Sequence, residues 1–212
     1  MMKLDYKKKL CIFTTSRADY GLLRTFIKLA ENNKKFNSFV IATASHLEKR
    51  NGFTFKEIET DGIKIFKKIN LKIKNDTPKA ISKSMATGII SFNKILEKIK
   101  PDVIIVLGDR IELLPICYAA LLLNIPIAHF NGGESTEGSI DELIRHAVSK
   151  LSHIHFPANK IYARRLVMMG ESPKRVFNVG GTSVDNIKNK KLLSKNELER
   201  FYGFEFQKKN FL

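Results

Sequence analysis

A glycine, an acid and a base follow one another directly after the most apolar run of the sequence. Gly108-Asp109-Arg110 comes immediately after residues 103–107 (VIIVL). Glycine lets the backbone approach a ligand closely. Asp109 is suited to moving a proton or orienting a sugar hydroxyl, and Arg110 to pairing with a phosphate through two hydrogen bonds. An ordinary salt bridge at a turn is the alternative interpretation of the same residues.

A second polar segment, His129-Phe130-Asn131-Gly132-Gly133-Glu134, follows another apolar run. The two glycines predict a tight loop with room for a ligand next to its backbone. His129 and Glu134 stand at the two ends of this loop and are candidates for a site. The alternative is a structural turn in which the glutamate caps a helix.

The predicted helix 139–151 carries two pairs of ionisable side chains at helical spacing in its first two turns. Asp141 precedes Arg145 by four residues, and Glu142 precedes His146 by four, so each pair shares a helix face. Both acids lie in the first turn, where the helix dipole favours a carboxylate. A solvated surface would explain the two pairs, but apolar residues occupy the intervening positions and favour a packed helix.

Near the N-terminus, Arg17 lies between the first predicted strand and the first helix, a position that approaches phosphate in doubly wound folds. No GxGxxG fingerprint is present, and we interpret Asp19 as the helix N-cap. His46 follows the second strand and fits a structural role as well as a functional one. Two further histidines, His153 and His155, lie in a short predicted strand and are interpreted as core or packing residues. No zinc-type spacing occurs, and we expect neither a metal nor a cofactor.

Short apolar runs alternate with helical patterns along the chain. The predicted strands are residues 9–14, 39–43, 63–71, 103–107, 125–128, 153–156 and 176–179. The predicted helices are residues 20–32, 78–100, 111–123, 139–151 and 160–169, with short helices after Gly181 and at 197–202. This order predicts an α/β fold, a doubly wound, Rossmann-like parallel sheet. Because ligands lie beyond the carboxyl ends of such strands, we expect Asp109, Arg110, Glu134 and Glu142 to share one crevice.

The composition limits the classes of partner. The chain has 212 residues, enough for one domain and part of another, and 43% are hydrophobic. No apolar run reaches the roughly 18 residues of a membrane span, no signal peptide is recognised, and the two cysteines fit buried thiols in the cytoplasm. The net charge of +16 comes from scattered lysines. We therefore expect an anionic small ligand, with no nucleic acid and no membrane as partner.

Five segments together carry a family resemblance, from about Lys9 to Ile187. They are SRADYGLL, ASHLEKRNGFTFKEIETDG, KPDVIIVLGDRIELL, IAHFNGGESTEGSIDELIRHAVSKLSHIHF and NVGGTSVDNI. In this order they resemble the hydrolysing UDP-N-acetylglucosamine 2-epimerases. Similar proteins include the epimerase half of the animal epimerase/kinase and bacterial enzymes of the sialic and legionaminic acid pathways.

The resemblance implies a glycosyltransferase-B architecture, in which two Rossmann-like domains enclose the site. Residues 1–187 would form the N-terminal domain, and residues 188–212 a linker and the start of the second. The implied reaction converts UDP-N-acetylglucosamine and water to N-acetylmannosamine and UDP, by elimination and then hydration, for sialic acid biosynthesis. We expect a homo-oligomer when the protein is full length, and a nucleotide sugar as its partner.

Roles carry over by motif. The implied acid–base residues are Asp109, Glu134 and Glu142, followed by Asp141 and His146. The implied substrate-binding residues are Arg17, Arg110, His46, His129, Asn131 and Arg145. Asn131 departs from the family pattern, because many relatives have an acid or a histidine there and an amide does not exchange protons at neutral pH.

Three alternatives stay open. Glu134 takes over the proton transfer, the substrate is a UDP-diacetamido or GDP-linked sugar, or the chain folds but is inactive. A basic module that binds nucleotides or nucleic acid is a further interpretation from a different class of protein.

Overall fold

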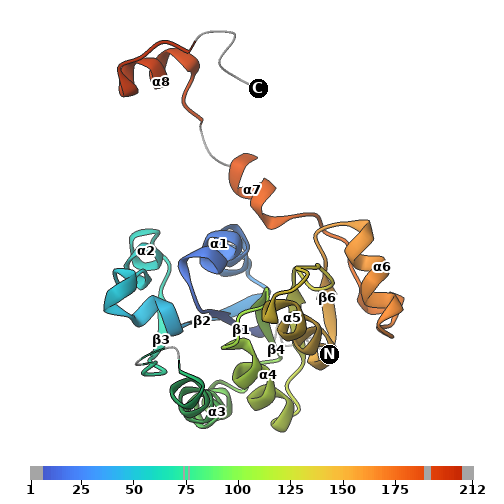
Figure 1. Ribbon diagram of the computed structural model, residues 1–212. Helices are drawn as coiled ribbons and strands as arrows, with labels where there is room; N and C mark the ends of the chain where they lie inside the picture. The colour runs from blue at the N-terminus through green and yellow to red at the C-terminus, as the bar shows by residue number, and fades with distance from the viewer. Residues whose placement is uncertain (1–6, 74, 76, 189–191, 207–212) are drawn as a thin grey trace, which may run out of the picture.

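The computed structural model describes residues 7–73, 75, 77–188 and 192–206, and its centre is a parallel sheet with helices on both faces (Figure 1). The strand order is β3-β2-β1-β4-β5-β6. The strands are β1 (Lys8–Thr14), β2 (Phe36–Thr43), β3 (Ile65–Ile69), β4 (Val103–Leu107), β5 (Ile127–Phe130) and β6 (Ile154–Phe156). All neighbouring pairs are parallel. The predicted doubly wound fold is confirmed, and the order reverses between β1 and β4.

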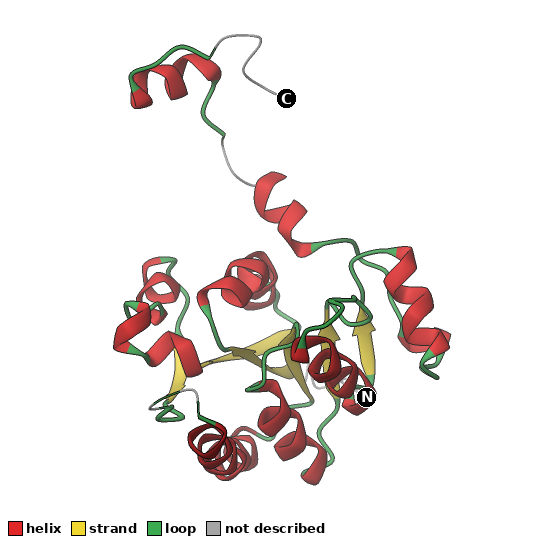
Figure 2. Ribbon diagram, viewed as in Figure 1, coloured by secondary structure: helices red, strands yellow, loops and turns green. Residues whose placement is uncertain are grey.

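Helices cover both faces of this sheet, as Figure 2 shows in red around the yellow strands. They are α1 (Arg17–Asn32), α2 (Phe55–Thr60), α3 (Pro78–Ile99), α4 (Leu113–Leu122), α5 (Ile140–Leu151), α6 (Lys160–Met168), α7 (Thr182–Lys188) and α8 (Lys195–Tyr202). Apolar side chains of α3, α4 and α5 form one core with the sheet, and those of α1 and α2 form the other. Since both faces are covered, the central strands are apolar throughout, as in the run VIIVL of β4.

Local sequence signals fix where the helices begin and end. Ser16 caps α1, and Asp19 returns a hydrogen bond to the cap backbone as the third residue of a capping box. The prediction of Asp19 as the N-cap is therefore wrong by three positions. Helix α3 begins after Thr77 with Pro78 in its first turn, and it ends at Lys100, which is left-handed and precedes a proline.

The last predicted strand, residues 176–179, is not formed. Only Val176 makes an isolated bridge, to His155, and the segment then leaves the sheet. Phe177 and Val179 are about half exposed, so the apolar alternation has no core to face. The predicted helix at 111–123 is also shorter, because the first residues after Asp109 form a turn before Leu113.

After β6 the chain comes back to helix α1, near the start of the sequence. Helix α7 lies along α1, where the Thr25 hydroxyl donates to Asn186 Oδ1 at 2.9 Å. Helix α8 stands away from the sheet in Figure 1. Part of the predicted linker, residues 189–191, lies outside the described residues. Within the described part of the chain, no helix combines the length and the apolar character that crossing a bilayer needs.

Candidate functional site

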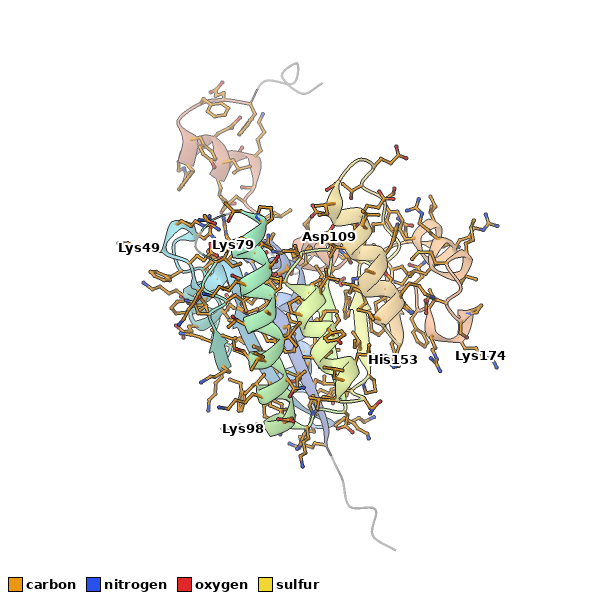
Figure 3. The ribbon with its side chains drawn as sticks, turned by 60° about the horizontal axis from the view of Figure 1, so that its bottom comes forward. Lys49, Lys79, Lys98, Asp109, His153 and Lys174 are labelled. Carbon is orange, nitrogen blue, oxygen red and sulfur yellow. The ribbon has the colours of Figure 1, made fainter. Side chains whose placement is uncertain are left out.

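The polar loops singled out in the sequence meet at the carboxyl edge of the sheet. The loops after β1, β2, β4 and β5 all emerge there, next to the point where the strand order reverses. Figure 3 shows Asp109 at this end of the molecule, whereas Lys98 and His153 lie toward the other end. Ligands of doubly wound sheets bind at such a reversal.

A buried arginine joins the loop after β4 to helix α5. Arg145 is only 5% exposed and forms an ion pair with Asp109, and its second nitrogen donates to Thr136 Oγ1 at 3.1 Å. Burial lowers the pKa of the Arg145 guanidinium, and the ion pair with Asp109 gives this buried charge a partner of opposite sign. Arg145 does not pair with Asp141 on its own helix, because its side chain turns inward to Asp109 while Asp141 stays exposed; the interpretation of a packed helix therefore holds at this position.

Glu142 belongs to the same hydrogen-bonded network. Its carboxylate accepts from the backbone N–H of Thr136 at 2.8 Å and from the Ser135 hydroxyl at 3.1 Å, and it lies 3.5 Å from His146 Nε2. These hydrogen bonds, the Thr136 backbone bond first, lower the pKa of Glu142 and keep it ionised. Thr136 therefore touches both Arg145 and Glu142, which connects Asp109 and Glu142 on one edge of the sheet.

Arg110 is held by a residue that the sequence analysis missed. Glu112, 3% exposed, accepts from Arg110 at 3.0 Å, and Ser45 Oγ accepts from the same guanidinium at 3.2 Å. Burial would lower the pKa of Arg110, but the Glu112 pair and the charges of Asp19 and Asp141 outweigh it and raise that pKa. The signal for Glu112 is present in the sequence, since it follows Arg110 by two residues at the start of a helix.

The loop after β5 needs its two glycines for packing. Gly133 has a φ of +78°, and a Cβ there would lie 2.5 Å from the Tyr162 carbonyl oxygen in α6. A Cβ on Gly132 would meet Ser149 Oγ at 2.9 Å. Arg165 donates to the Gly133 carbonyl at 2.7 Å and so fastens the loop to α6. The predicted close approach exists, but the backbone and side chains of the protein itself occupy it.

Two side chains of this loop have polar atoms without a hydrogen-bond partner among the described residues. Asn131 adopts a left-handed φ of +60°, and its Oδ1 is buried without a hydrogen-bond partner in the described part of the chain. Glu134 is half-buried, and no described residue donates a hydrogen bond to its carboxylate. Burial therefore raises the pKa of the Glu134 carboxyl group above its usual value.

His129 is fully buried beneath this loop. Its Nε2 lies 2.8 Å from the Gly108 carbonyl, which accepts only, so this nitrogen carries the proton. Nδ1 then accepts from the Ser149 hydroxyl at 3.1 Å. Burial lowers the pKa of His129 to about 4, and the ring is neutral. The ring thus joins the loops after β4 and β5, and both of its nitrogens are occupied by the protein.

His46 plays a similar part at the ends of β1 and β2. It lies in the short helix η1 (Ala44–Leu47), fully buried, with Thr14 Oγ1 at 2.9 Å and Thr54 Oγ1 at 2.8 Å from its two nitrogens. Burial lowers the pKa of His46, while the nearby charge of Asp19 opposes the shift. Asp19 also accepts from two backbone N–H groups, of Thr15 and Ser16. This network fixes the turn that carries Arg17.

The remaining candidate residues from the sequence lie outside the hydrogen-bonded network around Asp109. Arg17 is exposed and pairs with Glu57 at 3.1 Å. His155 is buried and contacts Glu171 at 3.1 Å, which confirms it as a core residue. His153 is exposed at the opposite edge and is not a core residue, but its Nδ1 accepts a hydrogen bond from the Ile127 backbone N–H at 3.3 Å, which fits the alternative of a packing residue. Among the described residues, no cluster of three or more histidine, cysteine, aspartate or glutamate side chains fits a metal ion.

Comparison with known proteins gives consistent results. The sequence model of the UDP-N-acetylglucosamine 2-epimerase family matches residues 28–212. A Campylobacter jejuni protein named GDP/UDP-N,N'-diacetylbacillosamine 2-epimerase (hydrolyzing) is 41% identical over 97% of this chain and 53% of its own length. A Legionella pneumophila protein named UDP-N,N'-diacetylbacillosamine 2-epimerase (hydrolyzing) is 36% identical, with 95% and 53% covered. The chain thus spans about half the length of these relatives.

A solved structure supports the same grouping. The UDP-GlcNAc 2-epimerase of Methanocaldococcus jannaschii, in complex with UDP-GlcNAc and UDP, superposes with a TM-score of 0.75 at 27% identity. The match covers 92% of this chain and 52% of that one. The sheet described above therefore corresponds to about half of that chain, as expected for one Rossmann-like half of the glycosyltransferase-B type. From these matches and the order of its loops, the chain belongs to the UDP-N-acetylglucosamine 2-epimerase family.

Proposed function

We propose that this chain provides one wall of the active site of a hydrolysing 2-epimerase that acts on a UDP-linked 2-acetamido hexose. With UDP-N-acetylglucosamine, the reaction consumes water and yields N-acetylmannosamine and UDP. In this proposal residues 1–187 are the N-terminal domain, and residues 188–212 lead into a second domain that completes the cleft. The family match supports the reaction class, and the acidic and basic groups at the carboxyl edge support the location.

The chemistry needs two proton transfers at C2 and a departing diphosphate. A base removes the C2 proton, the C1–oxygen bond breaks, and UDP leaves with that electron pair, which gives a 2-acetamidoglucal. Water then adds its oxygen to C1, and a proton returns to C2 from the opposite face. An acid–base group with a pKa near neutral serves this sequence best, and fixed positive charge assists the departing UDP.

Glu134 is our candidate for proton transfer. The observation that carries this assignment is its half-buried carboxyl group, with a raised pKa and no hydrogen bond from a described residue. Such a group is free to meet a substrate hydrogen. Glu142 is held ionised by its hydrogen bonds and suits electrostatic stabilisation. Asp109 is fastened by Arg145 and suits orientation of a sugar hydroxyl or of water.

The positive groups suit the diphosphate. Arg110 is partly exposed and already oriented by Glu112, so it offers its remaining N–H groups without further loss of side-chain freedom. Arg17 lies at the neighbouring strand end, where phosphate is approached by the start of α1. His129 and His46 position the loops around these groups, since protein atoms occupy both nitrogens of each ring.

A second candidate substrate comes from the relatives. The Campylobacter and Legionella proteins are named for N,N'-diacetylbacillosamine, which keeps the 2-acetamido group at the reacting carbon. The chemistry at C2 is thus the same, and only contacts to the rest of the sugar differ. We therefore test UDP-N-acetylglucosamine and UDP-N,N'-diacetylbacillosamine side by side. The substrate that is turned over will decide whether the proposed role is in sialic acid biosynthesis or in the biosynthesis of a related acid.

The test uses the 212-residue chain fused to the remaining half of the Campylobacter relative, with that relative itself as the positive control. Each UDP sugar is incubated in D₂O, and UDP release and the free sugar are followed by NMR. Elimination and hydration place deuterium at C2 of an inverted product. Release of an uninverted sugar that retains hydrogen at C2 would show simple hydrolysis. A fusion that folds and binds UDP but releases none from either substrate would refute the proposal.

A further inference from the structure

An arm of the chain, residues 177–188, leaves the edge of the sheet and ends in helix α7 (Figure 1). Its first anchor is the backbone N–H of Phe177, which donates to the His155 carbonyl at 2.8 Å. Beyond this point Val179 is about half exposed, and no residue of α7 is buried. The apolar side chains of α7, Val184 and Ile187, are 48% and 59% exposed. Burial therefore contributes little to holding α7 in place.

The second anchor of the arm is the side-chain amide of Asn186. Its Oδ1 accepts from the Thr25 hydroxyl at 2.9 Å, and its Nδ2 donates to the Gly21 carbonyl. Gly21 and Thr25 are four residues apart, so they lie on one face of α1, a turn from each other. Because a carbonyl oxygen only accepts, the contact with Gly21 fixes the orientation of the amide. Asparagine thus matches both partners, whereas an aspartate of the same size would present a second acceptor to the carbonyl.

This second anchor lies close to the end of α1 that carries Arg17. Asn186, Gly21 and Arg17 line the same hollow beside α1. The capping box of Ser16 and Asp19 fixes the first turn of this helix. After α7 the chain continues into residues 188–212, which the proposed function assigns to the start of a second domain. Asn186 therefore ties the segment that leads to the second domain to the helix that begins with Arg17.

We propose that Asn186 is a positioning residue, which fastens α7 to α1 and so sets how the second half of the protein stands against the carboxyl edge of the sheet. It acts through α7 rather than through contact with the substrate. When the tie is lost, the cleft spends less of its time in the arrangement that binds the nucleotide sugar. The apparent affinity falls in proportion to that fraction, whereas the chemical step in the assembled cleft keeps its rate. The effect on substrate affinity rests on the proposed function, and the fastening of α7 does not.

The first test measures hydrogen exchange of the backbone amides of α7 in the 212-residue chain. Asn186→Ala removes both hydrogen bonds, and Asp185→Ala is the matched control at the exposed neighbouring position. Both changes remove a side chain of the same size and raise the helix propensity by a similar amount. We expect α7 to exchange roughly tenfold faster in Asn186→Ala than in Asp185→Ala, the effect of two ordinary hydrogen bonds, and roughly threefold faster in Thr25→Val. Thr25→Ser keeps the hydroxyl and should exchange like the parent chain. Equal exchange in Asn186→Ala and Asp185→Ala would overturn the proposal.

The second test uses the fusion with the Campylobacter half, studied by small-angle X-ray scattering and steady-state kinetics. For Asn186→Ala we expect a broader distribution of interatomic distances, a KM for the UDP sugar raised roughly tenfold, and a kcat within about twofold of the parent fusion. Faster exchange of α7 with an unchanged distance distribution and KM would reduce Asn186 to a local contact and overturn its positioning role. A lower kcat at unchanged KM would also overturn it. If the parent fusion turns over neither sugar, the proposed function fails, and the scattering alone decides whether Asn186 positions the second half.

Discussion

Two glycines with the same backbone conformation provide a test of how the loop before Glu134 is held. Gly133 and Gly138 have φ angles of +78° and +77°. A methyl group on Gly133 would lie 2.5 Å from the Tyr162 carbonyl and 3.0 Å from buried Leu166, whereas one on Gly138 would have nothing within 4 Å. Substitution by alanine therefore separates backbone strain from close packing.

The magnitude follows from these two terms. A left-handed alanine costs about 1–2 kcal/mol, and the reduced freedom of the unfolded chain returns about 0.4–1 kcal/mol. Gly138→Ala should then lower the free energy of unfolding by about 1 kcal/mol. Gly133→Ala carries the same terms and adds overpacking of about 1–3 kcal/mol, which gives about 2–4 kcal/mol in total.

Urea unfolding followed by circular dichroism measures both variants against the parent chain. The urea dependence of the free energy should not change, because the surface exposed on unfolding is the same. If both variants lost equal stability, within about 0.5 kcal/mol, the packing of the loop against α6 would play no part. In the fusion protein, Gly133→Ala should also reduce turnover, since it displaces Glu134, while Gly138→Ala serves as the control.

Further predictions concern three charged or titratable side chains and the activity of the 212-residue chain on its own. In the active fusion, Asp109→Asn should lower turnover by about 10²-fold, because the group that orients a sugar hydroxyl or water is changed, and should also lower stability, because buried Arg145 loses its counter-charge; near-normal turnover would assign Asp109 to structure. Arg110→Ala should mainly weaken UDP binding, measured by calorimetry, and an unchanged affinity would contradict its assignment. Burial lowers the pKa of His129 from 6.5 to about 4. Its contribution to the free energy of unfolding is therefore complete above pH 6.5 and is lost as the pH falls toward 4. That contribution is about 3 kcal/mol. The urea midpoint of the parent chain should therefore fall more between pH 7.5 and pH 5.0 than the midpoint of the His129→Gln variant. An equal fall in both proteins would refute this role of His129. The 212-residue chain alone should release little UDP, because half of the cleft is missing and remote binding energy is lost; turnover within about tenfold of a relative would contradict this.

Much of the fold follows from patterns within the chain. The run VIIVL predicts β4 because a strand buried on both faces needs apolar residues throughout. The position of Asp109 then follows, since polar residues after parallel strands meet at one edge. Long-range contacts are not visible in this way. Helical spacing pairs Asp141 with Arg145, but the structure brings Asp109 from 36 positions earlier to the inner side of α5.

Burial explains the other differences between the sequence predictions and the structure. Residues 176–179 alternate like a strand, but a strand forms only where a neighbour and a core are available, and here Phe177 and Val179 face solvent. His129 and His46 resemble ligand-binding residues in the sequence because they follow strands. Their partners Ser149 and Thr54 lie on other elements, and only the folded chain shows that both rings are enclosed.

We expect the shared contact at Thr136 to couple the titration of the Asp109 and Glu142 carboxyl groups. Arg145 joins Asp109 to Thr136, and the Thr136 N–H binds Glu142. A proton added to either carboxylate changes the hydrogen bonds available to the other. The inflections of a pH–rate profile would then be macroscopic pKa values of the whole network, and none of them would belong to a single residue. Asp109→Asn should accordingly move the acid inflection even if Glu142 or Glu134 is the group that exchanges the proton.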